Sequence, residues 1–82
     1  MRCYCCSVKK KLLESFAALK TDNGEVYLCS DCYSLLYNIR DSFNNKNAKR
    51  NRKYIKELQE RKSTPQEDYK KWEDDFLKSY KL

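Results

Sequence analysis

Leu28-Cys29-Ser30-Asp31-Cys32 and the earlier stretch Cys3-Tyr4-Cys5-Cys6 decide how this chain folds. Each stretch holds a Cys-x2-Cys pair, and 22 residues separate the two pairs. Two such pairs at roughly this separation are typical of a tetrahedral zinc site with four thiolate ligands. Two intervening residues let both sulfurs of a pair reach one ion, and the second pair completes the tetrahedron. We therefore predict one structural Zn²⁺ bound by Cys3, Cys6, Cys29 and Cys32.

Other uses of the cysteines fit the sequence less well. Five cysteines is an odd number for a disulfide framework, and no secretory signal is recognisable before them. Leu12 and Leu13 are apolar, but Glu14 interrupts the run that a signal peptide would need. A redox Cys-x-x-Cys needs only one pair and usually lies in a βαβ unit, which we do not expect here. A disulfide framework and redox chemistry therefore remain less favoured alternatives to zinc binding.

Cys5 lies inside the first pair and is the fifth cysteine. We interpret it as a spare buried thiol. The alternative is that Cys5 replaces Cys3 or Cys6 as a ligand, but Cys3-x-Cys5 is short for the usual loop. Ser7 follows at the position where such loops often carry glycine, whose tolerance of positive φ suits amide-to-sulfur hydrogen bonds. Serine is expected to be accommodated there at some cost.

The size and composition favour a metal-stabilised domain. The chain has 82 residues, 37 % of them charged, and its mean hydropathy is −1.00. A chain this short and polar buries too little apolar surface to offset its conformational entropy easily, so zinc binding would supply folding free energy. No stretch approaches the roughly 20 apolar residues of a membrane span, and we expect no membrane partner. Free cysteines suit a reducing compartment, so we expect a cytoplasmic (intracellular) protein.

The segment between the cysteine pairs predicts a β-hairpin followed by a helix. Thr21-Asp22-Asn23-Gly24 is a turn, with Phe16 to Leu19 as the strand before it and alternating Val26 and Leu28 after it. Ser30 or Asp31 is expected to cap the next helix. An apolar stripe then follows at helical spacing, which Leu35 and Tyr33 widen: Cys32, Leu36, Ile39 and Phe43. The order of knuckle, hairpin and helix predicts a treble-clef-like zinc finger.

A family resemblance supports this arrangement. Residues 3–43 resemble the four-cysteine treble-clef modules of the zinc-binding N-terminal domain of the ClpX unfoldase and of McsA-type adaptors. The resemblance rests on Cys3-Tyr-Cys-Cys6 and on Gly24-Glu-Val-Tyr-Leu-Cys29-Ser-Asp-Cys32 leading into a helix. It covers about half of the chain and implies zinc, this fold, and a platform that pairs with itself or docks other proteins.

The second half is predicted to be a helical hairpin. Asn44 to Asn47 either breaks the first helix or forms a solvated turn of a longer one, and a basic helix follows from Ala48 to Lys62. Thr64, Pro65 and Glu67 form a capping box for the last helix. Its aromatic stripe is expected to meet an edge made by Tyr54, Ile55 and Leu58, or to dock a partner protein: Tyr69, Trp72, Phe76 and Tyr80. The domains are thus 1–45, a treble-clef zinc module with four cysteine ligands, and 46–82, a basic helix plus an amphipathic aromatic helix.

The charge distribution gives the functional hypothesis. The net charge is +6, and residues 46–62 hold eight Lys or Arg against two Asp or Glu. A basic helix beside a zinc module is a frequent way to bind DNA or RNA through phosphates, with Asn51 as a nearby polar contact. We assign this role to Lys46, Lys49, Arg50, Arg52, Lys53 and Lys56.

Two other functional classes are weighed against this one. The competing hypothesis is a protein–protein adaptor or inhibitor that docks through the zinc module or the aromatic helix, with a homodimer as one form of it. The alternative for the basic residues is an ordinary solvated helix face. Catalysis is not expected, because the chain has no His and a four-thiolate zinc site has no open position for a catalytic water.

Overall fold

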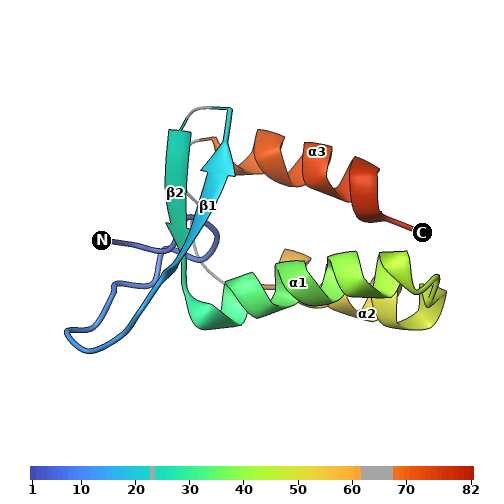
Figure 1. The fold of residues 1–82 in the computed structure, drawn as a ribbon, viewed down its shortest axis with the longest axis horizontal. Helices are drawn as coiled ribbons and strands as arrows, with labels where there is room; N and C mark the ends of the chain where they lie inside the picture. Colours follow the sequence, from blue (N-terminus) through green and yellow to red (C-terminus); the bar gives the residue numbers. More distant parts are fainter. Residues whose placement is uncertain (23, 62–67) are drawn as a thin grey trace.

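The computed structural model describes residues 1–22, 24–61 and 68–82. A two-stranded antiparallel sheet precedes three helices (Figure 1): β1 Ala17–Thr21, β2 Gly24–Leu28, α1 Ser30–Asn44, α2 Ala48–Gln59 and α3 Tyr69–Tyr80. This confirms the small α+β class. The finer assignment to the treble-clef group stays a prediction.

The hairpin brings the chain back to the first cysteine pair. Ala17 pairs with Leu28 and Thr21 pairs with Gly24, so the first strand runs two residues further than the predicted end at Leu19. Gly24 has a φ of 113°, a backbone conformation that only glycine adopts readily. Asn23 lies outside the described residues. The predicted hairpin is therefore confirmed, with its paired strands displaced toward the turn.

The helix α1 begins directly after Cys29, the first cysteine of the second pair. Cys29 is its N-cap residue, with extended backbone angles and no side-chain cap hydrogen bond, so the predicted caps at Ser30 and Asp31 were wrong. Both residues lie inside the first turn of the helix. The predicted stripe is buried at Cys32, Leu36 and Ile39. Tyr33 is 42 % exposed and does not widen the stripe.

The polar run after α1 ends that helix. Lys46 has a φ of 55°, which breaks the helical path. Asn47 is the N-cap of α2, and the Asn47 side chain accepts a hydrogen bond from the Arg50 N–H at 3.1 Å. The two helices are therefore separate. The second one ends at Gln59, earlier than the predicted Lys62, which lies outside the described residues.

The helices pair differently from the predicted C-terminal hairpin. α2 packs most extensively against α1, and α3 runs alongside α1 and begins near the sheet (Figure 1). Ile55 and Leu58 are buried in this core, whereas Tyr54 is only part-buried. The predicted capping residues Thr64, Pro65 and Glu67 lie outside the described residues, and α3 is described from its N-cap, Asp68.

One buried polar side chain joins all three helices. Asn51 on α2 is fully buried, and its amide donates to the carbonyl oxygens of Ile39 at 3.3 Å and Tyr80 at 2.8 Å and to the Ser42 hydroxyl at 3.3 Å. Its side-chain oxygen accepts from the Leu82 N–H at 3.0 Å. Asn51 is therefore a structural residue, and its predicted place in a nucleic-acid surface is wrong.

Across the described residues, no helix combines the length and apolar character that crossing a bilayer requires.

Candidate metal centre

Local backbone geometry brings the first cysteine pair into position. The chain forms a tight loop in which the Cys3 N–H donates to the Val8 oxygen and the Ser7 N–H donates to the Cys3 oxygen, both at 2.9 Å. Ser7 adopts a φ of 61°, the positive value expected at that position. The Tyr4 N–H donates to the Tyr27 oxygen at 2.8 Å, which ties this loop to β2 beside the second pair.

The four predicted ligands lie together. The sulfurs of Cys3, Cys6, Cys29 and Cys32 all lie within 4.8 Å of one another, and each residue is buried. The Cys6 and Cys29 sulfurs are 3.7 Å apart. A tetrahedron with zinc–sulfur distances of about 2.3 Å has sulfur–sulfur edges of about 3.8 Å. The four cysteines form no disulfide, so the donor set is positioned to bind one metal ion and its spacing fits zinc.

The surroundings of Cys6 favour the thiolate form that a metal needs. The Cys6 N–H donates to the Cys3 sulfur at 3.4 Å. Burial opposes ionisation of Cys6, but a backbone hydrogen bond with Val8 and contacts with the other cysteines outweigh it and lower the pKa of this thiol.

The second pair depends more on the charge of the metal itself. Burial raises the pKa of Cys29, and the hydrogen bond with Cys5, followed by burial, raises the pKa of Cys32. Both residues lie at the N-terminus of α1, where the helix dipole favours negative charge. A divalent cation among the four sulfurs favours the thiolate far more strongly, so metal binding is expected to release protons from this pair.

Arg61 supplies a positive charge beside the cysteine sulfurs. Burial lowers its pKa, but the charges of Cys32 and Cys6 and a hydrogen bond with Cys6 raise it more. Its Nη2 lies 4.0 Å from an Asp31 carboxylate oxygen, and its Nε is buried with no hydrogen-bond partner among the described residues. Four thiolates around one divalent ion leave a charge of about −2, which the single positive charge of this guanidinium offsets in part. Nothing in the sequence separates Arg61 from the other basic residues of 46–62.

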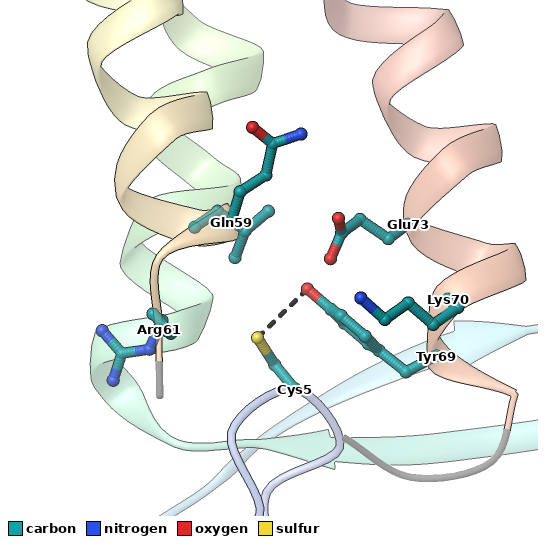
Figure 2. Close-up of a pocket in the computed structure, with 7 residues that line it drawn as sticks. Cys5, Gln59, Arg61, Tyr69, Lys70 and Glu73 are labelled. Carbon is teal, nitrogen blue, oxygen red and sulfur yellow. Dashed lines mark hydrogen bonds between the residues drawn. The ribbon is translucent and has the colours of Figure 1, made fainter. Parts of the chain in front are cut away.

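Cys5 lies outside the metal-binding group. It is 5 % exposed, and its Sγ donates to the Tyr69 Oη at 3.1 Å, so it fits the predicted spare buried thiol (Figure 2). The two side chains meet at the wall of a cavity of about 260 Å³ between the ends of α2 and α3. Burial raises the pKa of Tyr69. The contact therefore anchors α3 to the cysteine loop.

We expect Cys5→Ser to keep one bound metal ion per chain and Cys6→Ser to lose it at micromolar metal, because only the second change removes a ligand. The measurement is metal content after gel filtration, by elemental analysis. Serine nearly preserves side-chain size in both variants, so each controls for the other. Loss of metal from Cys5→Ser with retention in Cys6→Ser would show that Cys5 is a ligand.

The residues assigned to phosphate binding are all solvent-exposed. With 3.6 residues per helical turn, Lys49, Arg52, Lys53 and Lys56 share the face of α2 opposite its buried side. Arg50 lies on the flank of that face, and Lys46 lies in the turn before the helix. The Lys56 Nζ lies 4.0 Å from a Glu60 carboxylate oxygen, an exposed pair one turn apart that leaves the lysine open to solvent.

The aromatic stripe of α3 is part of the molecular core. Tyr69 is 3 % exposed and packs edge-on against Tyr4, so it is not available to a partner while α3 is docked. Trp72, Phe76 and Tyr80 are part-buried, with successive ring centroids 5.2 and 4.9 Å apart. These three rings line shallow grooves beside the end of β1.

No family model, no curated protein and no solved structure matches this chain. The resemblance to the ClpX and McsA modules therefore has no support beyond the cysteine motifs themselves. The structure supports a four-cysteine group placed to bind a metal ion.

Proposed function

We propose that this protein is a non-catalytic binding module, stabilised by one structural zinc ion, that contacts the phosphates of DNA or RNA through the outer face of α2. The observation that carries the proposal is the side-chain arrangement on α2. Four basic residues share one exposed face of a helix whose opposite face is held by buried Asn51, Ile55 and Leu58. The core thus fixes the position of the helix that carries these positive charges.

Zinc is the proposed metal because the donors are four thiolates. Soft sulfur ligands in a tetrahedron favour zinc over the harder divalent ions that prefer oxygen. A closed four-sulfur site leaves no position for substrate or water, so its role is structural. The metal holds together the two chain segments that carry the cysteines, and α1 runs from this site to the turn that begins α2.

The phosphate contact predicts salt-dependent binding. Metal-loaded protein should bind short duplex DNA or single-stranded RNA, and the logarithm of the affinity should fall linearly with the logarithm of the salt concentration. Changing Lys49, Arg52, Lys53 and Lys56 to Gln should weaken binding by about a hundredfold or more and flatten the slope by about three to four units. Fluorescence anisotropy of labelled oligonucleotides at several salt concentrations measures both quantities.

A matched control lies on α3. Changing the exposed Lys70, Lys71 and Lys78 to Gln removes nearly the same charge from another helix and should leave the slope nearly unchanged. Equal weakening by both sets would mean that only net charge matters, which contradicts a specific role for α2. Absence of binding at low salt with metal-loaded protein would reject the proposal outright.

The second candidate is a protein adaptor that uses α3, and the part-buried rings beside the β1 end favour it. If the protein is such an adaptor, replacing Trp72 or Phe76 should abolish partner binding. The α2 variant with Lys49, Arg52, Lys53 and Lys56 changed to Gln should still bind the partner.

A further inference from the structure

The loop between the first cysteine pair and β1 carries the most exposed apolar side chains among the described residues. Leu12 is 93 % exposed and Leu13 is 96 % exposed. The loop extends away from the sheet and helices in Figure 1, as the blue segment before β1. Isolated exposed leucines are ordinary on protein surfaces, but two neighbouring ones at such exposure on a projecting loop need an explanation.

The local backbone makes this arrangement specific. The Glu14 N–H donates to the Lys11 oxygen at 3.1 Å, which closes a four-residue turn with Leu12 and Leu13 at its two central positions. Central turn positions normally carry glycine, proline, asparagine, aspartate or serine. The sequence thus places two large apolar residues where folding requires none, and such departures tend to mark functional sites.

The turn is held firmly at its base. The loop is closed by a bridge between Arg2 and Lys9, and the Lys10 N–H donates to the Met1 oxygen at 2.9 Å. Three lysines, residues 9–11, precede the leucines, and Lys9 and Lys11 are exposed. The projecting loop therefore combines a convex apolar tip with neighbouring positive charge. We call Leu12 and Leu13 the leucine tip.

We infer that the leucine tip inserts into the surface of an anionic lipid bilayer while Lys9, Lys10 and Lys11 contact the headgroup phosphates. A convex apolar tip needs either a matching pocket or a deformable apolar medium, and a bilayer supplies the latter. Peripheral binding commonly requires two signals, an apolar group and a basic cluster, and both are present here within five residues. Such contact needs no membrane-spanning helix, and it departs from the expectation, drawn from the lack of a long apolar stretch, that the protein has no membrane partner. The inference does not rest on the proposed phosphate contact of α2.

The test is sedimentation of metal-loaded protein with vesicles of phosphatidylcholine, with and without about 30 % phosphatidylserine. We expect binding only to the anionic vesicles. Leu12→Ser with Leu13→Ser should weaken it by at least about tenfold, because two leucines leave the apolar phase. Changing the three lysines to Gln should weaken it by about a hundredfold, at about fivefold per lysine.

Matched controls separate this site from other surfaces. Tyr37→Ser removes an exposed apolar side chain on α1, 62 % exposed, and should leave vesicle binding unchanged. The α2 variant with Lys49, Arg52, Lys53 and Lys56 changed to Gln should retain most of the binding. Because the altered leucines are solvent-exposed, the loop variants should fold, which metal content and circular dichroism verify.

Insertion is distinguished from surface adsorption by moving the single tryptophan. In a Leu13→Trp/Trp72→Phe variant, emission should shift to shorter wavelength on anionic vesicles and be quenched by brominated lipid. The proposal is overturned by absence of vesicle binding at low salt, by undiminished binding of the leucine-to-serine variant, or by tryptophan emission that stays unquenched. Loss of binding in the α2 variant alone would assign the lipid contact to the basic helix and also overturn it.

Discussion

Removal of zinc is expected to unfold the entire described structure, including helices that carry no ligand. Cys3, Cys29 and Cys32 are part of the same buried cluster as Leu36, Ile39 and the α3 contacts, so the metal site is not separable from the core. A chain of this size supplies only about 3 to 5 kcal/mol from its own core. Structural zinc sites contribute apparent free energies of about 10 kcal/mol or more at neutral pH.

The measurement is far-ultraviolet circular dichroism and tryptophan emission during chelation under reducing conditions. Trp72 is the single tryptophan, and its ring on α3 packs edge-on against Tyr4 in the cysteine loop. Its emission therefore reports on the docking of α3, while circular dichroism reports on all three helices. Both signals should change together and recover when zinc is returned. An apoprotein that kept cooperative thermal unfolding, with a midpoint within a few degrees of the loaded protein, would contradict a structural role for the metal.

Replacement of Asn51 by alanine is expected to destabilise the protein as much as truncation of a fully buried core side chain. The side chain is fully buried and bonds to groups from α1, from the end of α3 and from the chain beyond it. It also satisfies the Tyr80 carbonyl, one of the groups that a helix C-terminus leaves without a partner. Loss of a buried polar side chain that serves several partners costs about 3 to 5 kcal/mol.

Chemical denaturation of the zinc-loaded protein, followed by circular dichroism, measures this change. Asn44→Ala, at the exposed end of α1, provides the matched control and should change stability by less than about 1 kcal/mol. Amide exchange gives a second reading, since the Leu82 N–H donates to Asn51 and should lose protection in the Asn51→Ala variant. Equal stability of the two alanine variants would mean that this hydrogen-bond group does not hold the helices together.

The metal ligands could be predicted because their chemistry fixes their spacing. Two Cys-x2-Cys pairs with a hairpin signal between them leave few arrangements that bring four sulfurs together. The same reasoning predicted the positive φ of Ser7 and the position of Cys32 in the first turn of a helix. The φ of Ser7 and the position of Cys32 depend on residues close to them in the sequence, so a single sequence is enough to predict them.

The packing of the helices could not be read in the same way. Tyr54, Ile55 and Leu58 form a short apolar edge that gives no indication of whether α1 or α3 covers it. Asn51 was grouped with the basic residues around it because polarity alone suggests exposure, whereas its four partners come from distant parts of the chain. The exposure of the leucine tip was equally hidden, because it depends on where the loop lies relative to the core.

Zinc-edge X-ray absorption of protein loaded with one equivalent of zinc shows directly whether four cysteine sulfurs bind the ion. We expect a first shell of four sulfur atoms at about 2.3 Å from the zinc, unchanged in Cys5→Ser. A first shell that contains nitrogen or oxygen, or fewer than four sulfurs, would contradict it.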